Sequence, residues 1–550
     1  MRMTGGEAMI RAAIANGIAT IFGLPGAQVY ALFEGIHETK LELIVPRHEQ
    51  TAAYMAMGYA KSTGKTGVFS VVPGPGVLNA AAALCTAMGN CSPVVCLTGQ
   101  IPSEYLGRGR GHLHELRDQL ATLGSIVKQA VRIDDPRATS HVVNGAFQTA
   151  RCGRPGPVSV EMCWDLMEET WDVAIDAGDL PCPEPEPDLN AIAAAAEIIA
   201  RARRPMIMCG AGAQHAAEAV RALAELINAP VTAFRSGRGI VPEDHALGVA
   251  AVAARELWDE VDVLICIGSR LEMPFMRWRD PMRYEARPAD SRELVRIDID
   301  AAEMTRLVPD VGIVADAATA CRLLVDRLAT RVTPRPERLE EIASAKRVAR
   351  SLIAKLVPQA AYLETIRAVL PRDGFLVPEV SQVGFATYTG AYPVLAPRTY
   401  VTEGFQGTLG FGFPTALGVK VAHRDRPVVS IAGDGGFMFA AAELATAAQY
   451  DIGLVTLVFN NRSYGNVLRD QQTLYGGHVT GAWLENPDFV RFAESFGVAA
   501  WRVGNPEELK PVLANALANN RPALIEVVVA PGTESSPWPL IHMPRRPSAV

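Results

Sequence analysis

The sequence predicts an α/β protein made of three doubly wound domains, each with a mostly parallel sheet covered by helices on both faces. Its 550 residues suffice for about three domains of roughly 100 to 200 residues each. Short apolar runs alternate with helical segments, and tight loops rich in glycine and proline join them. A proline-rich stretch and a charged helical connector divide this alternation into three blocks.

The first block, residues 1–179, alternates helices and strands from its start. Thr4 and Glu7 have the spacing of a capping box, so a helix is predicted through Ala13, with a left-handed stop at Asn16-Gly17. The elements expected after it are strand 18–22, apolar run 43–46, helix 48–60, strand 68–72, helix 77–88 and strand 93–98.

A linker and a connector separate the other two blocks. Prolines at every second position from Pro181 to Pro187 prevent a helix or a central strand there. A central Rossmann-like domain is expected at 190–330, and a charged helix follows it up to about residue 354. A third domain is expected at 355–532. The tail at 533–550 could cover a site or stay disordered. In the central block the expected strands are 206–209, 230–233 and 263–267. In the third block they are 428–431 and 454–459, with a helix at 440–449 between them.

Composition excludes several classes of function. The net charge is −7, from 52 basic and 59 acidic residues, which argues against a nucleic-acid-binding protein. Hydrophobic residues make up 49% and charged residues 20%, as in globular rather than disordered chains. No apolar run has the length of a membrane span, and Glu7 falls where a signal peptide would need its apolar core. A cytoplasmic protein without membrane or nucleic-acid partners is therefore expected.

Most of the nine cysteines are expected to be reduced core residues. Their number is odd, most lie in apolar surroundings, and no pair has the Cys-x-x-Cys spacing. Such cysteines are typical core residues in a reducing compartment. Neither a zinc site nor a disulfide framework is expected.

The strongest functional signal follows two strands of the third block. Gly433-Asp434-Gly435-Gly436 ends one strand and Asn460-Asn461 ends the next. Ligands bind at the edge of a parallel sheet where the carboxyl ends of its strands meet. Glycines let backbone N–H groups approach a phosphate, and carboxylate and amide oxygens suit Mg²⁺. An Asp-Gly turn or an Asn-Asn loop alone is commonplace, but together they indicate a magnesium diphosphate site.

With these motifs the chain resembles thiamin-diphosphate enzymes of the acetolactate synthase, pyruvate oxidase and benzoylformate decarboxylase group, most of all the acetolactate synthase large subunit. Further motifs have counterparts in the same order: Phe22-Gly-Leu-Pro-Gly26, Arg47-His-Glu-Gln50, Gly74-Pro-Gly76, Gly153-Arg-Pro-Gly-Pro157 and Gly407-Thr-Leu-Gly-Phe-Gly-Phe-Pro414. The resemblance implies a pyrimidine-binding, a central and a diphosphate-binding domain. It also implies a homodimer or homotetramer with active sites between subunits.

By this resemblance, Glu49 is expected to be the catalytic acid. It would face the cofactor aminopyrimidine, with its pKa raised by burial, and share a proton with the ring nitrogen. This favours the imino form, which takes the proton from the thiazolium carbon. Taken alone, Glu49 is an acid in the first turn of a helix, where the helix dipole favours it.

The resemblance also implies a set of cofactor contacts. The Gly407 carbonyl would bind the cofactor amino group, and Leu409 would support the bend between its rings, although a packed core leucine is the alternative. The expected diphosphate contacts are Ser381, Gln382, Gly433, Asp434, Gly435, Gly436, Asn461 and Tyr464. The expected magnesium ligands are Asp434, Asn461 and the backbone carbonyl of Ser463.

The basic loop 107–114 supplies two further candidates. By resemblance, His114 falls near a glutamine on the substrate side of the thiazolium ring, and His112 lies two residues before it. Either imidazole could move protons to a reaction intermediate near neutral pH. A solvated surface loop is the alternative.

In the central block, Gly210-Ala-Gly212 follows a strand, as the glycines of a dinucleotide-binding loop do, but the third glycine of that motif is missing. By the resemblance, Arg270 matches a flavin-contacting arginine of the synthases. FAD, a nucleotide and an empty domain all remain open.

Two departures bear on the substrate. The synthases carry a lysine in the stretch where this chain reads Met162-Cys-Trp-Asp165. They also carry a Gln-Trp pair in the stretch that corresponds to residues 465–470 of this chain. Branched-chain synthesis is therefore not implied. The sequence favours decarboxylation of a 2-oxo acid followed by carboligation to a second carbonyl compound. The alternatives are a non-ligating decarboxylase, a 2-hydroxyacyl lyase, a flavin- or nicotinamide-dependent oxidoreductase, and a silent homologue, against which Glu49 argues.

Overall fold

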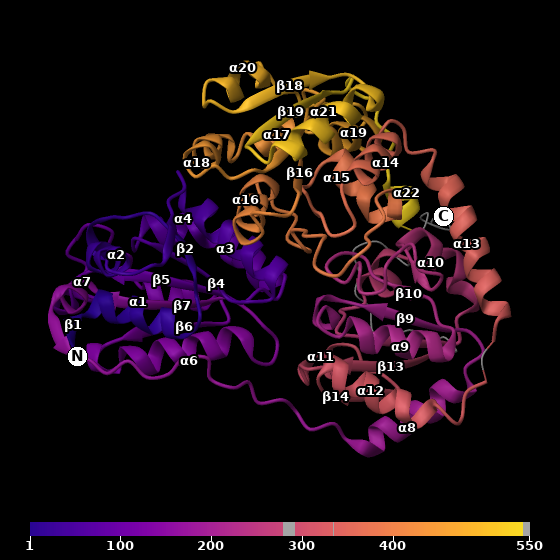
Figure 1. Ribbon diagram of the computed structural model, residues 1–550, viewed down its shortest axis with the longest axis horizontal. Helices are drawn as coiled ribbons and strands as arrows, with labels where there is room; N and C mark the ends of the chain where they lie inside the picture. Colours follow the sequence, from indigo (N-terminus) through magenta and orange to yellow (C-terminus); the bar gives the residue numbers. More distant parts are fainter. Residues whose placement is uncertain (279–291, 334, 543–550) are drawn as a thin grey trace.

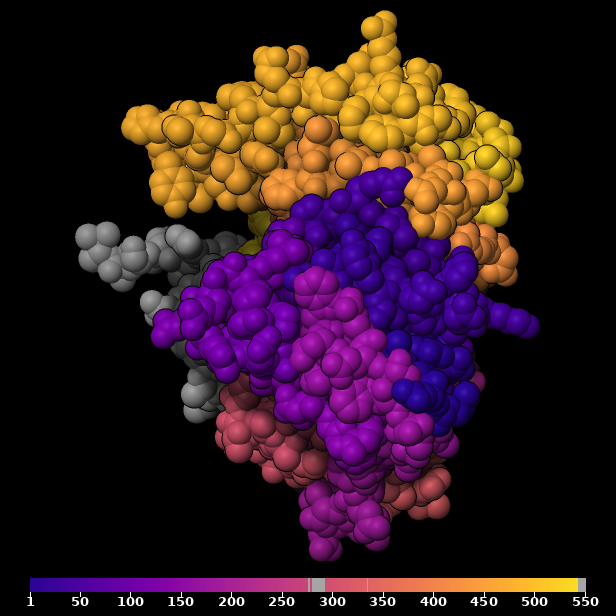
Figure 2. Space-filling view, turned by 90° about the vertical axis from the view of Figure 1, so that its left-hand side faces the viewer, coloured from indigo at the N-terminus to yellow at the C-terminus, as the bar shows by residue number. Residues whose placement is uncertain are grey.

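The computed structural model describes residues 1–278, 292–333 and 335–542, and it confirms the predicted α/β class. Three domains follow one another along the chain, and every strand pair within their sheets is parallel (Figure 1). In Figure 2 the first domain faces the viewer, with the third domain above it and the central domain below. Within the described ranges, no helix combines the length and apolarity that a bilayer span requires.

The first domain holds a six-stranded sheet of order β3-β2-β4-β5-β7-β6. Its strands are β2 (Thr20–Gly23), β3 (Glu42–Ile44), β4 (Gly67–Val71), β5 (Val94–Gln100), β6 (Gln129–Ile133) and β7 (Val158–Cys163), beside a short antiparallel pair of β1 (Arg2–Thr4) and β8 (Thr170–Asp172). Its helices are α1 (Gly5–Ala15), α2 (Tyr30–His37), α3 (Glu49–Thr63), α4 (Pro75–Gly89), α5 (Gln119–Gly124), α6 (Thr139–Arg151) and α7 (Trp164–Glu168).

The first helix begins and ends as its sequence predicts. The Thr4 hydroxyl accepts a hydrogen bond from the Glu7 backbone N–H at 3.1 Å, and Gly17 has a φ of +80° after the C-cap. The capping box is only half formed, because the Glu7 carboxylate binds Arg11 at 2.7 Å.

The central domain has the sheet order β11-β10-β9-β12-β13-β14. Its strands are β9 (Pro205–Cys209), β10 (Val231–Thr232), β11 (Gly248–Val249), β12 (Val263–Ile267), β13 (Glu293–Asp298) and β14 (Val311–Val314). Its helices are α8 (Leu189–Arg201), α9 (Ala217–Ile227), α10 (Ala251–Leu257), α11 (Ala302–Arg306) and α12 (Ala317–Leu328), and α13 (Glu337–Ile353) leads out of it.

The third domain has the sheet order β15-β16-β17-β19-β18. Its strands are β15 (Phe375–Pro378), β16 (Val428–Gly433), β17 (Val455–Asn460), β18 (Ala499–Val503) and β19 (Ala523–Val528). Its helices are α14 (Gln359–Val369), α15 (Gln382–Ala386), α16 (Gly412–Ala422), α17 (Asp434–Phe437), α18 (Leu444–Gln449), α19 (Gly465–Leu474), α20 (Phe489–Glu494), α21 (Pro506–Asn519) and α22 (Trp538–Ile541).

A disulfide joins Cys152 and Cys182, which corrects the expectation that the sequence supports no disulfide framework. Cys152 follows α6 and Cys182 lies in the proline-rich linker, so the bond fastens the linker to the first domain. The partners are 30 residues apart and have no local spacing signature, so only the fold brings them together. The bond also removes the argument from cysteines for a reducing compartment.

The first and third domains pack together through α3 and α16, which lie side by side in Figure 1. A Cβ built on Gly58 would lie 2.2 Å from the Thr415 carbonyl oxygen, and one on Gly418 would lie 2.0 Å from that of Met55. Only glycine permits such close contact between helices. One hydrophobic cluster runs from Phe22 and Phe69 of the first domain into the third domain.

We predict that Gly58→Ala destabilises the protein by about 1–3 kcal/mol, because the new methyl group overlaps the Thr415 backbone. Urea unfolding should show the loss. Gly145→Ala is the matched control: Gly145 also lies in a helix, has no atom near its Cβ position, and should gain about 0.5–1 kcal/mol. Equal stability of the Gly58→Ala and wild-type proteins would contradict the close contact.

Candidate active site

The pairing of two strands brings the predicted motifs to one edge of the third-domain sheet. β16 and β17 are adjacent and parallel, with Gly433 opposite Phe459. Asp434 opens α17 directly after β16, and Asn461 directly follows β17. Both residues therefore leave the sheet at its carboxyl edge, as the sequence predicted.

Asp434 is buried, with 1% of its surface exposed. Its Oδ2 accepts a hydrogen bond from Asn486 Nδ2 at 2.7 Å, and the same amide group reaches Asn460 Oδ1 at 3.1 Å. Burial raises the pKa of Asp434 to about 6, although the bond from Asn486 lowers it. Since no basic side chain pairs with Asp434 in the described part of the chain, its carboxylate suits an external cation.

Asn461 is held at both ends of its amide. Its Oδ1 accepts hydrogen bonds from the Ser463 backbone N–H and hydroxyl, each at 3.0 Å. Its Nδ2 donates to Glu534 Oε2 at 2.6 Å. The structure therefore brings Asn461 and Ser463 together.

The predicted diphosphate contacts converge on the glycine-rich loop. A Cβ on Gly435 would lie 2.5 Å from the Tyr464 ring, and one on Gly433 would lie 3.3 Å from Ser381 Cβ. Gln382 approaches from α15, and its Oε1 accepts a hydrogen bond from Arg469 at 2.9 Å. These side chains and the loop backbone form one polar surface at the sheet edge.

The loop that carries Gly407 and Leu409 lies against the first domain. Gly407 is exposed with a φ of +61°, and the hydroxyls of Thr408 and Thr86 lie 3.1 Å apart. Leu409 is only half-buried and does not belong to the buried core, so the alternative of a packed core leucine does not hold.

Glu379 is a buried acid that directly follows β15. Its two oxygens accept hydrogen bonds from the backbone N–H groups of Gly410 at 2.7 Å and Gly412 at 3.0 Å. A Cβ on Gly436 would lie 2.0 Å from its Oε1. Burial raises the pKa of Glu379 to about 7. This carboxyl group ties the Leu409 loop to the glycine-rich loop.

Glu49 is the first residue of α3, on the first domain, and is half-exposed. The His48 ring accepts a hydrogen bond from the Gln50 backbone N–H and caps the helix. Glu49 Oε2 accepts one from Asn79 of α4 at 3.0 Å. Among the described residues, no hydrogen bond or ion pair joins Glu49 to the Asp434 edge of the same chain.

The two candidate histidines occupy different environments. His114 Nδ1 lies 2.8 Å from Oε1 of the buried Gln28, which leaves Nε2 free of that contact. The His114 backbone also packs against Gly74, because a Cβ there would lie 2.4 Å from the His114 carbonyl oxygen. His112 stacks instead on Tyr105, with ring centroids 4.1 Å apart. His114 is therefore the better anchored of the two.

Three polar contributors to the edge were not predicted: Asn486, Arg469 and Glu534. Arg469 and Glu534 lie near one another, since each affects the pKa of the other. Asn486 lies in the irregular stretch before α20 and Glu534 in the C-terminal tail, where no motif marks them. Only Arg469 follows closely on the double asparagine, and that proximity was the one available signal.

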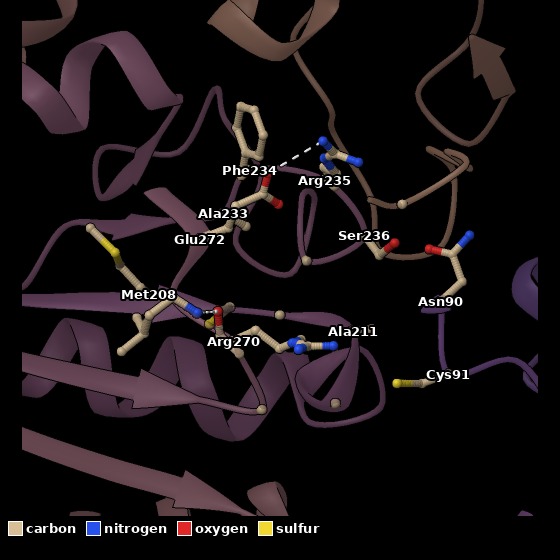
Figure 3. A pocket seen from close by; sticks show the side chains of 18 of the residues that line it. Asn90, Cys91, Met208, Ala211, Ala233, Phe234, Arg235, Ser236, Arg270 and Glu272 are labelled. Atoms are coloured by element: carbon tan, nitrogen blue, oxygen red, sulfur yellow. Dashed lines mark hydrogen bonds and ion pairs between the residues drawn. The ribbon is translucent and has the colours of Figure 1, made fainter. Parts of the chain in front are cut away.

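A second cleft lies at the carboxyl ends of β9 and β12, where the strand order of the central sheet reverses. The Gly210 backbone touches Gly268, and Arg270 stacks over Phe405 of the third domain at 5.1 Å. Figure 3 shows Arg235 paired with Glu272 on one side and Asn90 and Cys91 of the first domain on another. All three domains therefore line this cleft.

Three family models match the chain in sequence order. The N-terminal TPP binding domain of thiamine pyrophosphate enzymes matches residues 3–122, their central domain matches 192–324, and their C-terminal TPP binding domain matches 381–527. A probable acetolactate synthase large subunit of Methanocaldococcus jannaschii is 35% identical over 96% of this chain and 92% of its own length.

Two other relatives illustrate the range of activities. A probable 2-ketoarginine decarboxylase of Pseudomonas aeruginosa is 32% identical over 96% of this chain and 94% of its own length. The acetolactate synthase isozyme 3 large subunit of Escherichia coli is 28% identical over 96% of this chain and 95% of its own.

We predict that Glu379 makes stability depend on pH. Because burial raises its pKa above that of the unfolded chain, the folded state keeps a proton that the unfolded state releases. The free energy of unfolding should fall by on the order of 2–3 kcal/mol between about pH 5 and about pH 8. Glu379→Gln should lose this contribution, as urea unfolding of cofactor-free protein would show. Equal pH dependence in both proteins would refute it.

Proposed function

The chain belongs to the thiamine pyrophosphate enzyme family, and on that premise we propose that it is a thiamin-diphosphate- and Mg²⁺-dependent carboligase. It decarboxylates a 2-oxo acid and joins the remaining acyl unit to a second carbonyl compound, as acetolactate synthases do. The observation that carries the proposal is the meeting of Asp434 and Asn461 beside a glycine-rich loop at one sheet edge.

The donor set at that edge fits magnesium. Asp434 supplies a buried carboxylate that has no basic partner among the described residues, while Asn461 and the Ser463 carbonyl supply neutral oxygens. Mg²⁺ prefers such hard oxygen ligands and is often shared with a substrate or cofactor phosphate. Gly433, Gly435, Gly436, Ser381, Gln382 and Tyr464 would hold the diphosphate.

The chain's own residues divide the remaining work. When bound, the cofactor supplies a nucleophilic carbon and an electron sink. Glu49 would exchange a proton at its carboxyl group with the pyrimidine ring, and the Gly407 carbonyl and Leu409 would hold the cofactor bent. His114, fixed through Nδ1 by Gln28, would move protons at Nε2 on the substrate side. His112, on the surface beside Tyr105, is the weaker candidate.

We also propose that the site is completed between two copies of the chain, in a homodimer or homotetramer. Among the described residues, no hydrogen bond or ion pair joins Glu49 to the Asp434 edge of its own chain. Large apolar side chains are exposed beside the residues of both domains that would form the site. On the first domain, Leu78 and Leu113 lie near Glu49 and His114. On the third domain, Phe439 lies near Gly410 and Trp483 lies near Ser463. Burial of such side chains against a partner stabilises an interface.

The central cleft favours a second, non-catalytic ligand. Its place at the topological switch point of the sheet and its close Gly210–Gly268 contact suit a flavin or a nucleotide. The oxidoreductase alternative requires that such a ligand react. A yellow preparation that consumes NADH would favour it, and a colourless protein without NADH turnover would count against it.

We predict that calorimetry detects thiamin diphosphate uptake only when Mg²⁺ or another divalent ion is present, since Asp434 would hold the ion that neutralises the charge of the diphosphate. With pyruvate, the loaded enzyme should form acetolactate or acetoin. Acetaldehyde as the sole product would refute carboligation and favour the decarboxylase alternative, as in the Pseudomonas aeruginosa relative. Absence of uptake by the wild-type protein would refute the whole proposal.

We predict that Glu49→Gln lowers kcat by at least about 100-fold, because glutamine cannot exchange a proton with the cofactor. Its thermal midpoint and cofactor affinity should stay close to those of the wild type. Glu34→Gln, an exposed acid on α2, is the control and should leave kcat unchanged. Full activity in Glu49→Gln would defeat the assignment.

A further inference from the structure

The C-terminal segment, residues 529–542, is fastened beside the Asp434 edge. It begins where the Val529 backbone N–H donates to the Asn460 carbonyl at 3.0 Å. Further along, the Ser535 backbone N–H donates to the Val357 carbonyl at 2.9 Å, and its own carbonyl accepts from Gln359 Nε2 at 2.7 Å. The segment is therefore held on both sides of Glu534.

The far end of the segment docks on two domains. The Trp538 indole N–H donates to Asn466 Oδ1 at 2.7 Å, and its ring packs at a tilt against Phe385, with the ring centroids 4.6 Å apart. Arg255 of the central domain donates to the carbonyls of Pro539 at 3.0 Å and His542 at 3.1 Å. In Figure 1, α22 accordingly lies between α14 and α10. This docking gives Glu534 a defined position.

Glu534 turns from this segment toward the predicted metal ligands. Its Oε2 accepts the hydrogen bond from Asn461 Nδ2 at 2.6 Å, a short distance typical of a charged acceptor. The charges of Asp434 and Arg469 both act on the pKa of Glu534, Asp434 raising it and Arg469 lowering it, after burial, which raises it most. A second carboxylate near Asp434 increases the negative potential at the place where a cation would bind.

The hydrogen-bond chemistry decides which end of the Asn461 amide faces the metal. An ionised carboxylate only accepts hydrogen bonds, so Glu534 requires the NH₂ group of Asn461 on its side. The carbonyl oxygen then points the opposite way, toward Ser463, whose backbone N–H would clash with a reversed amide. Magnesium binds the carbonyl oxygen of an amide and not its nitrogen, so this orientation is the productive one.

We propose that Glu534 is a positioning residue of the metal site: through Asn461 Nδ2 it holds the amide with its oxygen toward the ion, and its charge adds to that of Asp434. The inference rests on the proposed function, because it presupposes the magnesium diphosphate site. It gives the C-terminal segment a role in metal binding. Partners of this kind around a metal ligand commonly contribute about 10–100-fold in affinity.

Two substitutions separate orientation from charge. Glu534→Ala removes both, and we expect it to weaken Mn²⁺ binding about 10-fold or more in the presence of thiamin diphosphate. Glu534→Gln keeps a carbonyl acceptor for Asn461 Nδ2 and loses the charge, so it should bind Mn²⁺ at least about three-fold more tightly than Glu534→Ala. Calorimetric titration of the full chain with Mn²⁺ measures both dissociation constants.

Thr533→Ala is the matched control on the same segment. Thr533 is exposed, and its hydroxyl bonds only locally to the Ala530 carbonyl, so Mn²⁺ affinity should not change. The thermal midpoint of each metal-free variant reports whether the fold is intact. If Glu534→Ala does not fold, Glu534→Gln still tests the role, since it should bind Mn²⁺ more weakly than the wild type.

Four outcomes would overturn all or part of the inference. Wild-type Mn²⁺ affinity in Glu534→Ala would exclude a role for Glu534. Wild-type affinity in Glu534→Gln would exclude the contribution of its charge. Equal weakening in Thr533→Ala would assign the effect to docking of the segment. Equal affinities of the Gln and Ala variants would exclude the orienting hydrogen bond. Failure of the wild-type protein itself to bind Mn²⁺ and thiamin diphosphate would instead remove the proposed function, and the two failures are thus distinguishable.

Discussion

The parallel pairing of β16 with β17 is the interaction on which the site depends. It sets Gly433 opposite Phe459, and Asp434 and Asn461 therefore emerge together at the carboxyl edge of the sheet. Burial of the Asp434 carboxylate without a basic partner in the described chain makes that edge suited to a cation from outside. The surrounding amides and hydroxyls supply the neutral oxygens that a hard cation needs.

Close packing of α3 on α16 sets the geometry of the first domain relative to this edge. Glycines at positions 58 and 418 let the two helices approach closely, and the Thr86–Thr408 contact ties α4 to the Leu409 loop. Glu49 heads α3 but lacks a contact with the edge of its own chain in the described residues. In the proposed dimer or tetramer, each half of the site would therefore be completed by another copy.

The sequence by itself determined the features that arise within a few residues or along one element. Thr4 caps α1 because its hydroxyl reaches an N–H three residues on, and β12 runs from Val263 to Ile267 because its apolar residues are continuous. The strand-glycine-aspartate and strand-asparagine patterns predicted the edge, because parallel strands end on the same side. The expectation of no disulfide framework was wrong, since Cys152 and Cys182 are neighbours only in the fold.

Only the tertiary structure decided which distant groups complete the edge. Asn486 and Glu534 reach Asp434 and Asn461 from irregular segments 52 and 73 residues away in sequence, and Glu379 becomes buried beneath two loops. Such contacts have no signature in the sequence, because a single polar side chain forms no periodic pattern. Its partner depends on how the folded chain brings distant segments together. The local sequence therefore determines the motifs and the sheet edge at which they lie. Burial and long-range packing determine the charge state and the orientation of their side chains.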